Sequence, residues 1–343
     1  MSFRSWLTIG TLVLLGTVVY FGWPEISQAW RLLGSVNGWI LALLIPVQLL
    51  SYYAVGNIIF SYLRSKGNIK DVSRWSMARM ALELNFVNHI LPSGGAAGFS
   101  YLGWLLGRHG VSGGRAAMAQ IIRYTLMFVT FIGLLFVSVL ALILDNNVNR
   151  ITILTCVVLA LLVVGGTIFV IYIIGSATRI KKFSKVLSNT ADWLVSFVTF
   201  GKKHHVVKHQ KVEDFFNELH VDYVEIRNDK KVLKQPLIWA IIANIADVLL
   251  LSIAFGALGS WISLATLFIA FGVSGLSGFI SVTPGGTGLY EAIMIAFLAS
   301  AGVPADIAIA GTLLARVALL SGTVIFGYIF YQLTILKYGK NPA

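Results

Sequence analysis

Six long stretches of this 343-residue chain contain no more than two charged side chains each. A helix needs about 20 apolar residues to cross the roughly 30 Å hydrocarbon core of a bilayer. A soluble protein of this size would have to present a polar exterior instead. Each stretch is therefore predicted to be a membrane-spanning helix. They cover residues 6–23, 36–62, 116–144, 151–174, 236–258 and 305–336.

The composition agrees with a membrane protein. Of the residues, 57% are hydrophobic and only 12% are charged, about half the charged fraction of a soluble domain. The formal net charge is +12, which in a soluble protein would suggest a nucleic-acid partner. In a membrane protein, lysine and arginine accumulate on the cytoplasmic side, so we expect no nucleic-acid partner. The sequence predicts an all-α, polytopic membrane bundle.

Two further apolar regions, residues 77–107 and 261–301, are interrupted by proline and glycine. Residues 77–90 and 94–107 would each be about 21 Å long as a helix, too short to span a bilayer. Irregular backbone at membrane depth is tolerated only where it is buried in protein or lines a wet cavity. We therefore predict two re-entrant hairpins. Their turn residues are Pro92, Gly94 and Gly95 in the first and Pro284, Gly285, Gly286 and Gly288 in the second.

The basic residues indicate how the chain is oriented. With the N-terminus inside and hairpins that return to the side they enter, 22 of the 26 lysines and arginines fall on the inner side. Only Arg31 and Arg150 fall outside. This follows the positive-inside rule and predicts a multi-pass protein of the cytoplasmic membrane with both termini in the cytoplasm. Residues 261–282 are long enough to span alone, an alternative that would place the C-terminal lysines outside.

We predict one integral membrane domain over residues 1–343, with a basic cytoplasmic loop at 176–236 and an internal repeat. Gly-Val follows each hairpin proline after 18 residues, and one arginine, Arg123 or Arg316, lies in the long apolar run beyond. The repeats cover about residues 75–144 and 237–336. Because the predicted hairpins enter from opposite sides, the repeats are inverted, as in many transporters with a site near the midplane. Alternatively, the hairpins only pack the bundle, since glycine also permits close helix contacts.

Charged side chains within membrane spans are rare and mark function by default. Arginine binds phosphate through paired hydrogen bonds and keeps its charge without water, so a phospholipid head group is the expected ligand. The alternative is that Arg123–Glu83 and Arg316–Glu291 are structural ion pairs. The candidate substrate-binding residues are Glu83, Arg123, Asp247, Glu291 and Arg316, with Asn88, His89 and Tyr290 beside the hairpin turns.

Two segments resemble the flippase-like membrane region of lysylphosphatidylglycerol synthases. These are V-T-P-G-G-T-G-L-Y-E-A at 282–292, followed by Arg316, and the looser L-P-S-G-G at 91–95, followed by Arg123. The resemblance covers the chain from the first span to residue 336. It implies translocation of an aminoacylated or otherwise modified phospholipid between leaflets. By position it points to Glu291, the two arginines and the two Pro-Gly turns.

Bifunctional members of that family also carry a soluble domain that transfers lysine from tRNA to the lipid. We expect a stand-alone membrane member without it, and so no catalytic residue, metal or cofactor. The sequence contains neither G-x-S-x-G nor G-x-x-x-x-G-K-[ST], and no span has Cys and His at metal-ligand spacing. The expected partners are membrane phospholipids and a separate lipid-modifying enzyme. The alternatives are a solute or ion-coupled transporter, an enzyme acting on a lipid head group, and a non-transporting partner of a synthase or polyprenyl-glycan enzyme.

Overall fold

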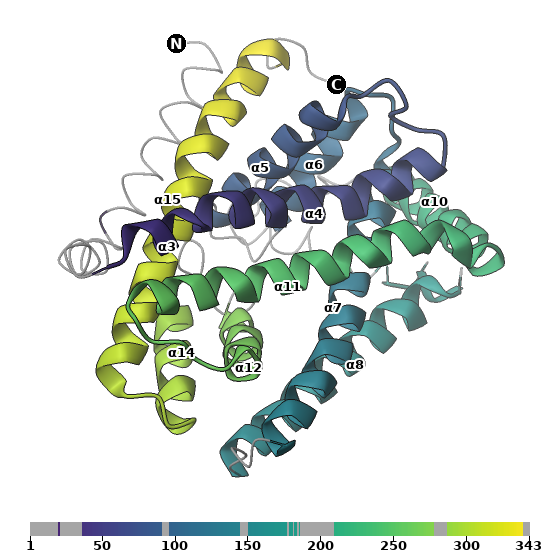
Figure 1. Cartoon of the computed structure of the whole chain (residues 1–343). Helices are drawn as coiled ribbons and strands as arrows, with labels where there is room; N and C mark the ends of the chain where they lie inside the picture. The colour runs from purple at the N-terminus through teal and green to yellow at the C-terminus, as the bar shows by residue number, and fades with distance from the viewer. Residues whose placement is uncertain are drawn as a thin grey trace, which may run out of the picture.

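A computed structural model describes residues 36–90, 96–144, 150–176, 209–277 and 287–338, with Tyr20 and six residues between 178 and 185. Every regular element in these residues is helical (Figure 1). Five helices in the described part are long and apolar enough to span a membrane, which confirms five of the six predicted spans. The sixth prediction, residues 6–23, lies outside the described residues. So do the turn residues Pro92, Gly94, Gly95, Pro284, Gly285 and Gly286.

The helices fall into a long and a short class. The long ones are α4 (Leu44–Ser65), α7 (Gly113–Leu144), α8 (Arg150–Ile174), α11 (Lys234–Ala257) and α15 (Ala305–Tyr338). A short helix, α3 (Gly38–Ala42), precedes α4, and a 3-10 helix, η2 (Lys230–Leu233), precedes α11. The shorter ones are α5 (Arg74–Ile90), α6 (Ala96–Gly107), α10 (His209–Asn228), α12 (Leu264–Gly275) and α14 (Leu289–Ser300).

The two interrupted regions fold into pairs of short helices. α12 and α14 have 12 residues each, or about 18 Å, too short to span a bilayer alone. α5 packs on α6 and α12 packs on α14. Each region also packs on the long helix that follows the other region, because α5 packs on α15 and α12 packs on α7. The two predicted repeats, 75–144 and 237–336, are therefore packed against one another rather than forming two separate lobes.

The Gly-Val pairs of the two regions form the same turn. Gly110 and Gly302 both have positive φ, 74° and 89°, a conformation that glycine adopts without strain. The N–H of Val111 donates to Leu106 O at 3.2 Å, and the N–H of Val303 donates to Leu298 O at 3.0 Å. These are the closing hydrogen bonds of a glycine-terminated helix. The predicted similarity of the two regions thus extends to backbone geometry.

α4 and α11 run side by side in opposite directions (Figure 1). The N–H of Asn37 donates to Ala257 O at 2.8 Å at one end of the pair. Near the other end, the rings of Tyr53 and Trp239 meet edge to face at 5.4 Å. This antiparallel pair lies at the centre of the bundle's packing, because both α7 and α15 pack against it.

α10 binds the ends of α4 and α7 through its acidic residues. Glu218 accepts the N–H of Gly114 at 2.9 Å, and the buried Asp222 pairs with Arg115 at 3.0 Å. A third acid, Glu225, pairs with Lys66 at 2.6 Å. The hydrogen bond from this lysine lowers the pKa of the exposed Glu225 carboxyl.

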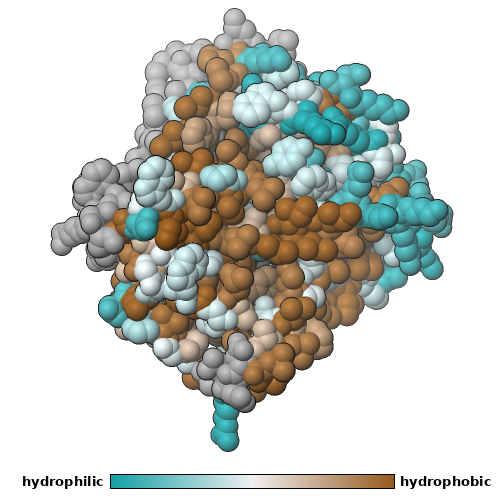
Figure 2. Space-filling view, in the orientation of Figure 1, coloured by the Kyte–Doolittle hydropathy of each residue, from teal (hydrophilic) through white to brown (hydrophobic). Residues whose placement is uncertain are grey.

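The outer surface is that of a multi-pass membrane protein. Figure 2 shows hydrophobic side chains across the broad middle of one face, with hydrophilic ones gathered toward the end where α10 lies. Among the five described spans, α8 is the most exposed, and Leu161 on it is 68% exposed. A soluble monomer rarely exposes so large an apolar surface.

Gly327 permits the close contact between α15 and α5. A Cβ at this position would overlap the Cβ of Phe86 and lie 3.1 Å from the carbonyl oxygen of Leu82. We expect Gly327→Ala to lower the free energy of unfolding by about 1–3 kcal/mol, because two helix backbones would have to separate. Thermal unfolding in detergent measures the effect. Gly165→Ala on α8, where nothing lies within 4 Å, should be neutral or stabilising; equal losses in both variants would contradict this account.

Candidate functional site

Arg316 and Glu291 form an ion pair inside the bundle. Nε of Arg316 donates to Oε1 of Glu291 at 2.7 Å, with side chains 11% and 5% exposed. Gly288, which precedes α14 with a φ of 89°, donates its N–H to Oε2 of the same carboxylate at 2.6 Å. Glu291 therefore caps its own helix and holds the arginine of α15 at the same time. The Arg316–Glu291 ion pair is thus present, and its purely structural role stays an alternative prediction.

Three more of the predicted residues surround this pair. The guanidinium of Arg316 lies over the ring of Tyr290, 4.6 Å from its centroid. His89 on α5 is close enough to interact with the charge of Arg316, and Asp247 on α11 is close enough to interact with Tyr290. Asp247 also accepts a hydrogen bond from Oγ of Ser51 on α4 at 2.6 Å. Side chains of four helices besides α14 thus lie in the neighbourhood of this ion pair.

Glu83 forms a second buried cluster with partners that differ from the expected one. Its carboxylate is 0% exposed and pairs with Nε of Arg79 at 3.0 Å. Thr334 and Tyr101 donate their hydroxyls to it at 2.7 and 2.6 Å. The alternative of an Arg123–Glu83 pair is therefore wrong. Arg79 lies four residues before Glu83 on the same helix face, and these donors occupy both carboxylate oxygens.

Two predicted residues lie outside both clusters. Arg123 is buried in α7, with its guanidinium 4.3 Å from the ring centroid of Tyr124. In the part of the chain that the structure describes, no hydrogen bond or ion pair joins it to Glu83 or Glu291. Asn88 packs against Gly98 of α6, and its Oδ1 has no hydrogen-bond partner among the described residues.

Three buried threonines, which we call the threonine stripe, follow one face of α15. Thr312, Thr323 and Thr334 are 1%, 2% and 1% exposed and are spaced by 11 residues. Eleven residues make three helical turns with a drift of only about 20°, so the stripe runs nearly parallel to the helix axis over about 33 Å. Arg316, four residues after Thr312, lies on the same face. The stripe is as long as the hydrocarbon core is thick.

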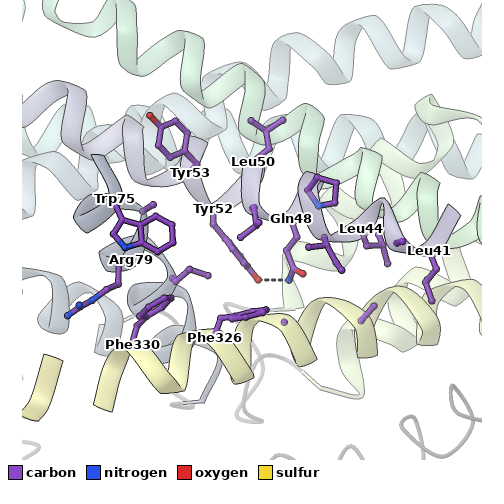
Figure 3. Close-up of a pocket in the computed structure, with 18 of the residues that line it drawn as sticks. Leu41, Leu44, Gln48, Leu50, Tyr52, Tyr53, Trp75, Arg79, Phe326 and Phe330 are labelled. Atoms are coloured by element: carbon purple, nitrogen blue, oxygen red, sulfur yellow. Dashed lines mark hydrogen bonds between the residues drawn. The ribbon is translucent and has the colours of Figure 1, made fainter. Parts of the chain in front are cut away.

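A cavity of about 1060 Å³, the lateral groove, lies between α3 and α4, α5 and α15 (Figure 3). Most of its walls are apolar. The exception is a hydrogen-bonded chain in which the amide of Gln48 donates to the hydroxyl of Tyr52 at 2.5 Å, and this hydroxyl bonds to Thr323. Trp75 and Arg79 lie at one end of the groove, together with Arg74. The groove thus combines an apolar body, polar groups along one wall, and cations at one end.

The sequence model of one protein family, the lysylphosphatidylglycerol synthase TM region, matches residues 7–327 of this chain. The chain belongs to this family. It is also similar to a UPF0104 membrane protein of Methanothermobacter thermautotrophicus, with 22% identity over 312 residues that cover 90% of this chain and 89% of that protein. No solved structure matches the chain.

In this member of the lysylphosphatidylglycerol synthase TM family, sequence reasoning missed several residues of the site. Arg79 is one of the 22 basic residues on the predicted inner side and was not considered for the site, although its spacing of four from Glu83 was a usable signal. The 11-residue spacing of the threonines in α15 was another. Gln48, Ser51 and Tyr52 carried no signal, because single polar residues are common in apolar helices.

Proposed function

We propose that this protein moves a phospholipid between the two leaflets of the cytoplasmic membrane. The observation that carries the proposal is the lateral groove, an apolar cavity with the hydrogen-bonded chain of Gln48, Tyr52 and Thr323 along one wall. The groove offers apolar surface for acyl chains, and Gln48 and Tyr52 on its wall offer polar groups to a head group that crosses the hydrocarbon. Without such partners, burying a polar or charged head group is costly.

Arg316 is the proposed head-group site. A guanidinium has five N–H donors and binds phosphate through two of them at once. Glu291 occupies Nε of Arg316 at 2.7 Å, so an arriving phosphate competes with this carboxylate for the arginine. Replacing the Glu291 carboxylate by the lipid phosphate would keep Arg316 paired with an anion both with and without bound lipid. We further propose that Arg123, the equivalent residue of the first repeat, contacts the lipid later along the path.

Buried polar atoms without hydrogen-bond partners among the described residues support a polar ligand inside the bundle. Such atoms are found on Gln120 of α7, on Ser274 and Ser277 at the end of α12, and on Thr312 of α15. Each unsatisfied buried group is destabilising by about 1–3 kcal/mol. A head group that bonds to them would offset part of this cost.

We propose that the two hairpins are re-entrant and form an inverted repeat, with both chain termini in the cytoplasm. The matching Gly-Val turns and the reciprocal packing of α5 on α15 and of α12 on α7 support this arrangement. Access would alternate as one repeat moves against the other. A separate enzyme that modifies the lipid is the partner that this function implies.

Asp247 supports a second candidate, an ion-coupled transporter. It lies in the middle of α11, and its hydrogen bond within the described residues comes from the neutral Ser51. No lysine or arginine of the described part forms an ion pair with it. A carboxyl within an apolar span is suited to carrying a proton or binding a cation.

Leaflet exchange of fluorescent lipids in proteoliposomes tests the proposal. The lipids are phosphatidylglycerol, its lysyl ester and a polyprenyl phosphate, with protein-free vesicles as the baseline. We expect selective exchange of at least one lipid above this baseline. Exchange of none of them by folded protein would overturn lipid translocation. Uptake of a cation or solute in the same vesicles would favour the second candidate.

A further inference from the structure

A second cavity, of about 410 Å³, lies between α7, α8, α10 and η2 and shares no lining residue with the lateral groove. We call it the α7–α8 cavity. Its inner walls are apolar and include Ile122 of α7, Val170 and Ile174 of α8, and Leu233 of η2. Volumes of about 300–1,000 Å³ are typical of ligand sites. Among the helices that line the cavity, α8 is the most exposed of the described spans, so the cavity lies next to the surrounding lipid.

The rim of the cavity is basic because α10 has two different faces. Its acidic residues are directed at α4 and α7, where they bind the residues described above. Tyr223, Ile226 and Arg227, at helical spacing, line the cavity instead, and Lys230 follows at the start of η2. One side of α10 thus holds the bundle together, and the other presents positive charge beside an apolar cavity.

The two cations are available to a ligand. Arg227 and Lys230 are exposed, and within the described residues neither pairs with an acid. The nearest acids in sequence have other partners: Glu225 pairs with Lys66, and Asp229 accepts the N–H of Lys231 at 3.1 Å.

We propose that the α7–α8 cavity binds an anionic phospholipid of the adjacent leaflet, with an acyl chain among the apolar side chains of α7 and α8 and the phosphate between Arg227 and Lys230. Two features favour a phospholipid over a soluble anion. The interior of the cavity is apolar, and cations next to the ends of membrane spans attract anionic lipids. The site is separate from the proposed translocation path and would act on stability or activity rather than carry the transported lipid.

Thermal unfolding of the purified, detergent-solubilised protein tests this site. Phosphatidylglycerol is added to one sample and phosphatidylcholine with the same acyl chains to another. Because a ligand that binds only the folded state stabilises it, we expect phosphatidylglycerol to raise the midpoint by about 2–4 °C more than phosphatidylcholine does. The double variant Arg227→Glu/Lys230→Glu should lose most of this difference.

The double variant Lys231→Glu/Lys234→Glu is the matched control. It changes the net charge equally at two neighbouring exposed positions that do not line the cavity, and it should keep the difference between the two lipids. If both double variants lost the difference in midpoint equally, the effect would come from general surface charge, and the proposed site would be overturned. An equal shift of the midpoint with inorganic phosphate, or no preference for phosphatidylglycerol in the unmodified protein, would also overturn the site.

Ile122→Trp, which fills the cavity, should also abolish the preference for phosphatidylglycerol. Leaflet exchange of lipids is measured in parallel to distinguish this site from the translocation path, because the variants of the α7–α8 cavity should still move lipid between leaflets.

Discussion

Replacing Arg316 with alanine is expected to slow lipid exchange about 100-fold or more. The substitution removes the proposed phosphate ligand and leaves Glu291, 5% exposed, without its cation. Truncating one partner of a buried, hydrogen-bonded charge pair between two binding partners typically costs about 2–5 kcal/mol of binding, and each 1.4 kcal/mol corresponds to a factor of ten. Exchange is measured in proteoliposomes by the fluorescent-lipid assay. Arg150→Ala, at the exposed start of α8, is the control and should exchange lipid at the normal rate.

A purely structural role of the Arg316–Glu291 pair makes a different prediction. The double variant Arg316→Ala/Glu291→Gln removes both charges, so it should recover part of the thermal stability lost in Arg316→Ala. If the arginine binds the lipid, exchange stays abolished in this double variant. Recovery of exchange together with stability would assign the pair to the structure and remove Arg316 from the transport mechanism.

Filling the lateral groove should also abolish exchange. Ala318 lines the groove on α15, and the indole of Ala318→Trp would occupy space that we assign to an acyl chain. Because the cavity of about 1060 Å³ has room for this side chain, we expect the thermal midpoint to change little. The exchange rate should fall at least about tenfold, and Ala318→Leu should give an intermediate rate.

Leu161→Trp is the control for this substitution, because it adds the same indole to the exposed surface of α8. Normal exchange by Ala318→Trp, with the protein folded and inserted, would show that the lipid does not pass through the lateral groove. Slow exchange by both variants would point instead to an effect of bulky side chains on insertion.

Much of the fold could be predicted from the sequence. Apolar length alone located the five spans in the described residues, because crossing a bilayer sets a minimum helix length. The Gly-Val pairs were predicted only as a feature of the repeat, and they form the turns that end α6 and α14, since only glycine adopts the required left-handed conformation easily. The start of α12 was less well predicted. Trp261, the first residue of the predicted apolar stretch, packs on Gly256, and the helix begins at Leu264.

The site was only partly predictable, because burial and partner choice depend on how helices meet. Glu291 and Arg316 were found through a local motif and a charge in an apolar run. The partner of Glu83 was not, because Arg79 lies at the boundary of an apolar stretch, where sequence alone does not separate loop from bundle. The threonines of α15 were missed for another reason. A threonine hydroxyl can bond to its own helix backbone, as Thr323 does to Leu319 O at 2.9 Å, so an isolated threonine in a span predicts nothing.

The threonine stripe has a consequence for how this protein can change during evolution. Each residue added to or removed from α15 would rotate everything beyond it by about 100°. Such a change between Thr323 and Thr334 would take Thr334 away from Glu83 and Arg79, even though every amino acid in the helix was kept. Substitutions on the opposite face would have no such effect. In related proteins that keep the stripe, α15 should therefore differ in amino-acid identity but not in length between the first and the last threonine.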